Sequence, residues 1–254
     1  MSVSRDKIVS FCSDYLKVEN FRDYCHNGLQ VSGTDKINKI VTGVTISKKL
    51  TESAIQKKAD MIIVHHGVFM RSFGEFPVID GYWRERLKLL LNNDISLCGF
   101  HLPLDAHPLI GNNISILKVL GLLKVCGILE EGQQIGFVGE YKKAVARDKF
   151  IELVDKKLET KSVALNFGSK QIKKVGVISG SASSAWSAVL ELGCDTFLTG
   201  DLREDIVRPV DESGLNIINA GHYNSERFGI INLGKLIQKK FKVSVEFVEI
   251  SCSV

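Results

Sequence analysis

The 254-residue chain lacks the patterns that mark several classes of protein. Its six cysteines are widely separated and include no CxxC pair, so neither a disulfide framework nor a zinc finger is indicated, and we expect a reducing compartment. No stretch approaches the roughly 18 to 20 apolar residues that span a bilayer. The first 18 residues lack the uninterrupted apolar run of a signal peptide and are typical of an amphipathic helix. We therefore expect a cytoplasmic protein.

Neither sign of charge dominates the sequence. The net charge is +4, and the pairs of adjacent lysines are scattered along the chain. This distribution favours a solvated surface over a track for nucleic acid, although a basic rim that attracts phosphorylated substrates stays open. The chain also lacks the GxxxxGK[ST] loop of P-loop nucleotide-binding proteins.

The chain does contain an alternation of strand-like and helix-like segments. The first block of this alternation predicts strands at 39–46, 60–66 and 94–101 and helices at 47–59, 81–93 and 112–123. Ser47 is placed to cap the first of these helices. Such a rhythm favours an α/β fold with a mostly parallel or mixed sheet and helices packed on it.

A second block follows after a less regular middle. It predicts strands at 172–179, 194–200, 215–222 and 242–250, helices at 183–193 and 224–241, and a helical or turn region at 202–214. We interpret residues 127–170, which contain four glycines up to 139, as a connecting or peripheral segment. The expected domains are 1–128 and 129–254, two βα lobes; an alternative is that residues 224–250 pack back onto the first lobe.

Five of the six histidines fall at or just past the carboxyl end of a predicted strand, where open α/β sheets bind their ligands. Two carboxylates lie among them, and Glu226 follows His222 by four residues, so both share one helical face. The candidate residues are His65, His66, His101, Asp105, His107, His222 and Glu226.

Each candidate has an ordinary alternative when taken singly. His65 and His66 could be polar residues of a loop, and Asp105 could cap a helix or order a turn. Taken together, His65, His66, Asp105, His222 and Glu226 form the mixed nitrogen and oxygen set of a dinuclear transition-metal site. Such a set suits two divalent ions of Zn, Fe, Mn or Co, with Glu226 as the candidate bridging carboxylate.

Several segments closely resemble the signature segments of the NIF-three-like family, described as GTP cyclohydrolase I type 2 homologues. They are "NGLQVSG", "VTGVTISKKLTESAIQKKADMIIVHHG", "GFHLPLDAHPLIGNN" and "AGHYNSERFG". The resemblance implies a two-lobed subunit, a toroidal homohexamer and a dinuclear site at the same five ligands. It implies that His101 and His107 support the ligands or contact the substrate. The segment "SGSASS" departs from the glycine-rich turn of close relatives, which argues against a substrate-binding role for this loop.

The resemblance also implies an activity, in which a metal-bound hydroxide opens the guanine ring of GTP while His101 or His107 transfers protons. Two alternatives stay open: a two-metal phosphoesterase or damaged-nucleotide hydrolase, and a metal-binding interaction scaffold without catalysis. The expected partners are a nucleotide or other small-molecule substrate and further copies of the chain, with no membrane or nucleic acid. Asn27 has two interpretations, as a turn residue or as a residue that orders the N-terminal loop over the site.

Overall fold

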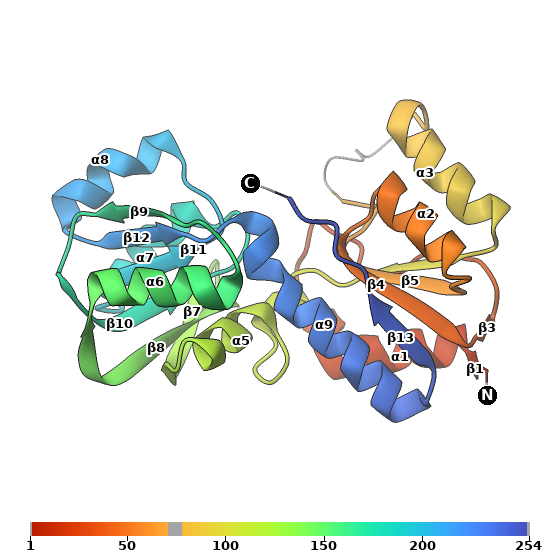
Figure 1. Cartoon of the computed structure of the whole chain (residues 1–254), viewed down its shortest axis with the longest axis horizontal. Helices are drawn as coiled ribbons and strands as arrows, with labels where there is room; N and C mark the ends of the chain where they lie inside the picture. The colour runs from red at the N-terminus through yellow and green to blue at the C-terminus, as the bar shows by residue number, and fades with distance from the viewer. Residues whose placement is uncertain (1, 71–77, 253–254) are drawn as a thin grey trace. The chain divides into compact units, whose positions relative to one another are not determined.

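The computed structural model describes residues 2–70 and 78–252. The chain divides into two compact units, which Figure 1 shows with their elements labelled. Unit 1 comprises Met1–Leu104 and Gly229–Ile250, and unit 2 comprises Asp105–Phe228 and Ser251–Val254. Each unit is a mixed α/β structure built on its own sheet.

Unit 1 is built on a five-stranded sheet of order β13-β4-β5-β6-β2. The strands are β2 (Gly28–Val31), β4 (Lys39–Thr45), β5 (Met61–His66), β6 (Ser96–Gly99) and β13 (Ser244–Phe247). Neighbouring strands are parallel except for the β2–β6 pair, which is antiparallel. Strands β1 (Val3–Ser4) and β3 (Lys36–Ile37) form a separate two-stranded antiparallel sheet. The parallel order of β4, β5 and β6 brings the carboxyl ends of these strands to one edge.

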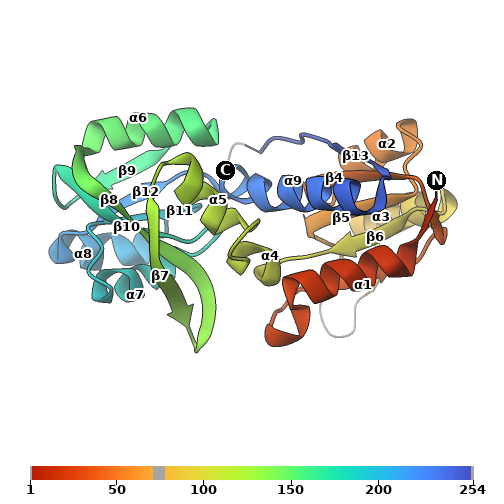
Figure 2. The same ribbon diagram turned by 90° about the horizontal axis from the view of Figure 1, so that it is seen from below.

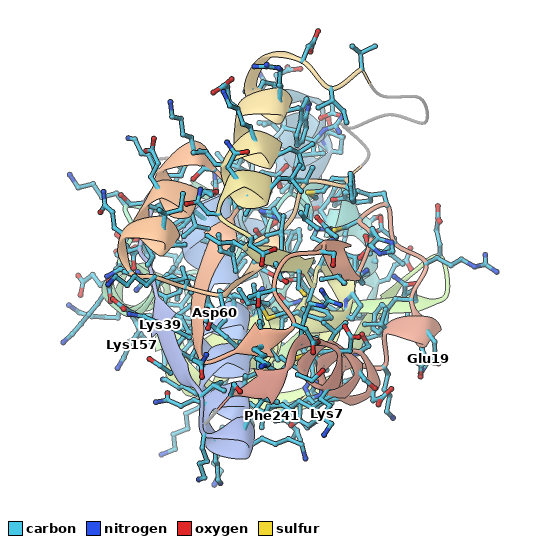
Figure 3. The ribbon with its side chains drawn as sticks, turned by 90° about the vertical axis from the view of Figure 1, so that its right-hand side faces the viewer. Lys7, Glu19, Lys39, Asp60, Lys157 and Phe241 are labelled. Atoms are coloured by element: carbon cyan, nitrogen blue, oxygen red, sulfur yellow. The ribbon has the colours of Figure 1, made fainter. Side chains whose placement is uncertain are left out.

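Helices cover both faces of this sheet (Figure 1). Helices α2 (Lys48–Gln56) and α3 (Gly81–Asn92) lie on one face, and α1 (Arg5–Leu16) lies on the other with the C-terminal part of α9 (His222–Phe241). Ser47 caps α2 as predicted, because its Oγ accepts a hydrogen bond from the Leu50 N–H at 3.2 Å. Phe241 of α9, labelled in Figure 3, packs edge-on against Phe11 of α1 with ring centroids 5.4 Å apart.

Unit 2 is built on a six-stranded sheet of order β7-β8-β10-β11-β12-β9. The strands are β7 (Leu123–Glu130), β8 (Gln133–Ala146), β9 (Val163–Asn166), β10 (Gln171–Val177), β11 (Thr196–Thr199) and β12 (Asn216–Asn219). The central strands β10, β11 and β12 are parallel, and the outer pairs are antiparallel. The sheet is therefore mixed.

Helices also sandwich the sheet of unit 2 (Figure 2). One face is covered by α5 (Asn112–Val119) and α6 (Arg147–Leu158), and the other by α7 (Trp186–Glu191) and α8 (Glu204–Ser213). Three further short helices lie in the described part of the chain as a whole. They are α4 (Leu102–Ala106) and the 3-10 helices η1 (Val18–Asn20) and η3 (Ser183–Ala185). The helices of unit 2 pack against its sheet in two separate hydrophobic clusters, one on each face of that sheet.

The structure corrects the interpretation of residues 127–170. This segment is not a connection: it contributes the second half of β7 together with β8, α6 and β9 to the sheet and core of unit 2. The glycines that lie in its strands are required by close packing. A Cβ at Gly139 would lie 2.7 Å from Leu117 Cδ2, and one at Gly127 would lie 2.6 Å from Gln134 Oε1. These glycines resemble loop residues in the sequence, but they lie in strands, at positions where a neighbouring side chain packs directly against the backbone.

The division between the units falls at Leu104 and Asp105 rather than near residue 128. The physical reason is that Ile116 and Leu117 of α5 pack in one buried cluster with Phe137 and Phe150 of unit 2. At the other end of the chain, β13 pairs in parallel register with β4 of unit 1. Among the described residues, no helix is long and apolar enough to cross a membrane.

Candidate metal centre

The end of β5 presents two imidazoles. His65 is fully buried, and its Nδ1 lies 2.9 Å from the carbonyl oxygen of Phe100. A carbonyl oxygen only accepts hydrogen bonds, so Nδ1 carries the proton and Nε2 is the nitrogen that can bind a cation. His66 places its Nδ1 2.9 Å from Thr45 Oγ1, on the neighbouring strand β4. The two rings have centroids 4.5 Å apart although they come from adjacent positions of one strand.

A third imidazole, that of His101, joins this pair from the segment after β6. Its ring centroid lies 4.9 Å from that of His65 and 5.5 Å from that of His66. One ring nitrogen of each of the three histidines lies within 4.8 Å of those of the other two, so the three could hold one cation. The family resemblance implies that His101 supports the ligands, contacts the substrate or transfers protons; the structure places it beside both predicted ligands of unit 1.

Asp23 fixes the ring of His101. Its Oδ1 and Oδ2 lie 2.9 and 3.2 Å from His101 Nδ1, and both side chains are almost fully buried. Burial would raise the pKa of Asp23, but hydrogen bonds from His101 and Asn27 and the charge of His101 lower it to about 2. Asn27 orders the N-terminal loop, because its side-chain oxygen accepts a hydrogen bond from the His101 N–H at 2.7 Å.

In unit 2, His222 and Glu226 lie on the first turn of α9. Their side chains meet with Nε2 and Oε2 3.0 Å apart, as expected for residues four apart on one helical face. Glu226 is buried, whereas the His222 side chain is 40% exposed. Gly180 lies against this pair with φ +70, and a Cβ there would collide with Glu226 Oε1. The carboxylate therefore occupies space that only a glycine leaves.

Asp105, also in unit 2, is held by two hydrogen bonds to one oxygen. Its Oδ1 accepts from Asn112 Nδ2 at 2.7 Å and from Ser179 Oγ at 2.9 Å. Ser179 and Gly180 open the "SGSASS" segment, for which the sequence argued against a role with substrate. The structure gives this segment a different task, since Ser179 orients Asp105 and Gly180 makes room for Glu226.

His107 has a local structural partner. Its Nδ1 accepts hydrogen bonds from the backbone N–H groups of Leu109 at 3.2 Å and Ile110 at 3.3 Å. Within residues 2–70 and 78–252, it belongs to none of the groups of three or more potential metal ligands. These contacts order the turn before α5.

The residues present fit a metal ion. Histidines that bind metals usually donate their other ring N–H to a carbonyl or carboxylate, and carboxylate ligands are themselves hydrogen-bonded. His65 and His101 meet the first condition and Asp105 meets the second. The combination of imidazole and carboxylate suits Zn, Fe, Mn or Co. The supporting residues Asp23, Thr45 and Ser179 were not found from the sequence, because their partners are 78, 21 and 74 residues away in the chain.

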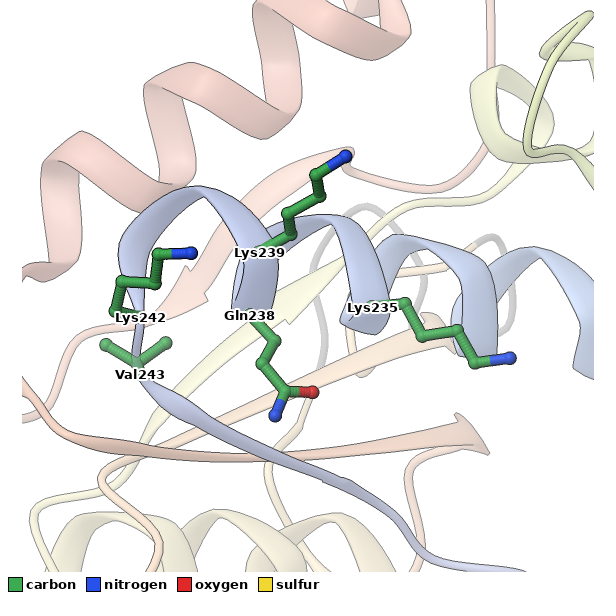
Figure 4. Close-up of a pocket in the computed structure, with 5 residues that line it drawn as sticks. All are labelled: Lys235, Gln238, Lys239, Lys242 and Val243. Atoms are coloured by element: carbon green, nitrogen blue, oxygen red, sulfur yellow. The ribbon is translucent and has the colours of Figure 1, made fainter.

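The described part of the chain has a cavity in each unit. The cavity in unit 2 has a volume of about 560 Å³, and one of its lining residues, Gly221, directly precedes His222 in the sequence. It is lined by Glu159, Thr160, Lys161, Val163, Asn219, Gly221, Asn224, Ser251 and Cys252. The other, of about 460 Å³ in unit 1, is lined by Lys235, Gln238, Lys239, Lys242 and Val243 (Figure 4). No candidate ligand lines either of these two cavities. Of the two, the cavity in unit 2 is the one with a lining residue adjacent in sequence to a candidate ligand.

Comparisons with known proteins place the chain in a family. The profile of the family Duf34/NIF3 (NGG1p interacting factor 3) matches residues 3–253. A Haemophilus influenzae protein named GTP cyclohydrolase 1 type 2 homolog is 39% identical over 236 residues, covering 92% of this chain and 93% of the relative. A Pseudomonas aeruginosa protein of the same name is 36% identical over 251 residues, covering 98% of each chain.

A solved structure agrees with these sequence matches. The structure titled "protein ybgI, unknown function" superposes with a TM-score of 0.94 at 34% identity, covering 99% of this chain and 100% of that chain. The resemblance first seen in short segments thus extends over the whole fold. The protein belongs to the Duf34/NIF3 family.

Proposed function

We propose that this protein is a dinuclear metal-dependent hydrolase that acts on a nucleotide, with His65, His66, Asp105, His222 and Glu226 as ligands. The observation that carries the proposal is the way the candidate ligands are held. The Nδ1 atoms of His65 and His66 lie 2.9 Å from oxygen atoms of Phe100 and Thr45, and Asp105 Oδ1 accepts two hydrogen bonds. Prearranged polar side chains of this kind are typical of metal sites.

Bound divalent cations would lower the pKa of a coordinated water and offset negative charge on the substrate. The residues of the chain supply the rest. Asp105 and Glu226 contribute the negative charge that balances the cations, and His65, His66 and His222 contribute neutral nitrogen ligands. His101 lies next to His65 and His66 and is the group proposed to move a proton during hydrolysis.

We propose GTP as the substrate, with hydrolysis at C8 of guanine that opens the five-membered ring and releases formate. Support for this choice comes from the name GTP cyclohydrolase 1 type 2 homolog, which the relatives carry at 36% and 39% identity. A further support is the cavity of about 560 Å³ in unit 2. It is lined by Lys161 and by Gly221, the residue that precedes His222 in the sequence. An ammonium group there could attract a phosphate.

The test is to incubate metal-loaded protein with GTP and other nucleotides and to follow the products by mass spectrometry. We expect formate and a pterin triphosphate from the wild type and none from Glu226→Ala. Glu191→Ala, which removes an exposed carboxylate of α7, is the control and should behave as wild type. If phosphate is the only product, the reaction is phosphoester hydrolysis, and the proposal of ring opening is wrong. No product from any nucleotide at full metal loading would refute the hydrolase.

We also propose that the chain assembles as a homohexamer, as its resemblance to the family implies. Native mass spectrometry should then show six times the mass of the subunit. For an enzyme, Glu226→Ala should abolish turnover and leave this assembly intact. If the same substitution disrupts the assembly, the cations serve a scaffold and the catalytic proposal is wrong.

A further inference from the structure

We propose that Asp23 is a positioning residue that holds the proton of His101 on Nδ1, so that Nε2, the ring nitrogen opposite Asp23, presents its lone pair for the proposed hydrolysis. This inference rests on the proposed hydrolase function for its chemical step. Its structural part, the assignment of one tautomer to His101, is independent of any substrate.

The carboxylate of Asp23 is saturated with donors. Oδ1 accepts from the Cys25 N–H at 3.0 Å, and Oδ2 accepts from Asn27 Nδ2 at 2.9 Å and from the Leu102 N–H at 3.0 Å. His101 Nδ1 completes the set at 2.9 Å from Oδ1. The side chain of Asp23 is only 2% exposed, so its charge depends on these partners rather than on water.

This arrangement determines which ring nitrogen of His101 carries a proton. Three N–H groups already donate to the two oxygens of Asp23, which favours the ionised carboxylate, and an ionised carboxylate can only accept hydrogen bonds. Nδ1 of His101 must therefore be the donor, and in the neutral imidazole Nε2 then has the lone pair. The side of the ring that can take up a proton is the side opposite Asp23.

The surroundings of Nε2 suit a proton acceptor. Tyr24 places its hydroxyl 3.4 Å from Nε2, and with Nε2 unprotonated this hydroxyl is the donor. Tyr24 is 49% exposed, so the row Asp23, His101 and Tyr24 runs from a buried carboxylate to a phenol at the surface. On the same ring, one nitrogen lies within 4.8 Å of a nitrogen of His65 and of His66.

The backbone of His101 is also held by the loop that carries Asp23. Asn27 accepts a hydrogen bond from the His101 N–H at 2.7 Å and donates to Asp23 Oδ2 at 2.9 Å. Ring and main chain of His101 are thus fixed together. A purely structural role for Asp23 would require only the contacts to Cys25, Asn27 and Leu102; the contact to the ring adds control of the tautomer.

The experiment compares wild type with Asp23→Asn, which keeps the size of the side chain but replaces one acceptor oxygen by a donor. Asp14→Asn is the control, because Asp14 is an exposed carboxylate of α1 that accepts only from Ser10, at 3.3 Å, among its described contacts. Nitrogen-15 NMR of metal-free protein at neutral pH should show His101 with its proton on Nδ1 in wild type and Asp14→Asn, and on Nε2 in Asp23→Asn.

With metal and substrate, Asp23→Asn should lower kcat by ~10²-fold or more while bound metal and KM stay near wild type. A proton on Nε2 of His101 in the wild type overturns the proposal, and this reading needs no variant to fold. An unchanged kcat in an Asp23→Asn protein whose tautomer has switched also overturns it. If the wild type turns over no nucleotide, the hydrolase proposal fails, whereas the tautomer assignment is still decided by the spectra.

Discussion

The two units hold their candidate site residues by opposite means. In unit 1, His65 and His101 each direct Nδ1 toward an oxygen that only accepts, namely the Phe100 carbonyl and the Asp23 carboxylate. In unit 2, Asp105 is surrounded by donors, the amide of Asn112 and the hydroxyl of Ser179. A nitrogen ligand needs an acceptor behind it and an oxygen ligand needs a donor, so the chemistry of each ligand dictates its support.

The two units also differ in how much space they leave. The imidazoles of unit 1 lie at the end of β5 and just after β6, where parallel strands bring them to one edge of the sheet. Glu226 of unit 2 instead fills the place of a missing side chain at Gly180. Unit 1 is therefore sensitive to loss of hydrogen-bond partners, and unit 2 is sensitive in addition to any gain of volume at one position.

The largest expected effect comes from removing one nitrogen ligand from each unit. We expect His65→Ala combined with His222→Ala to lower bound metal by more than the ~10- to 100-fold typical of losing a supporting hydrogen bond. Elemental analysis after dialysis measures the metal content. His26→Ala is the control, since His26 is exposed and belongs to none of the candidate groups among the described residues. Two equivalents of metal remaining in the double variant would refute the ligand set.

The second effect isolates the space at Gly180. Gly180→Ala places a Cβ on Glu226 and strains a backbone with φ +70, whereas Gly132→Ala strains φ +78 where nothing lies within 4 Å. Both should lose about 1–2 kcal/mol of stability from the backbone. Gly180→Ala should lose a further ~1–3 kcal/mol from overpacking, and should also bind less metal. Urea denaturation measures the difference; equal losses in the two variants would contradict the close contact.

The smallest effect compares the supports of the two units. Thr45→Val removes the partner of His66 Nδ1, and Ser179→Ala removes a donor to Asp105. Each should weaken metal binding by about tenfold, measured by competition with a chelator. Thr42→Val is the matched control on β4, because the buried Thr42 hydroxyl has no hydrogen-bond partner within the described residues. An effect of Thr42→Val as large as that of Thr45→Val would mean that the strand, rather than the hydroxyl, is responsible.

The sequence was most informative where one chemical pattern acts locally. The strands at β4 and β5, the capped helix between them and the pairing of His222 with Glu226 all follow from spacings of a few residues. For the same reason, the candidate residues could be chosen from the ends of predicted strands. Their role as metal ligands stays a prediction that the metal analysis will test.

The sequence was least informative where long-range packing decides the outcome. The glycines of β7 and β8 conceal two strands, because each is required by a neighbour such as Leu117 or Gln134 that sequence spacing does not reveal. Asp23 escaped notice because its role depends on His101, 78 residues later. Contacts across such distances follow from the fold as a whole, and no local propensity indicates them.

Gly180 has a consequence for the comparison of related sequences. A residue with a Cβ at this position cannot coexist with a carboxylate placed as Glu226 is here, so the two positions should change together during evolution. A family member that keeps the glutamate but replaces the glycine must place the glutamate carboxylate, the helix or the loop differently. Examining these two positions in an alignment would separate relatives that preserve this half of the site from those that share only the fold.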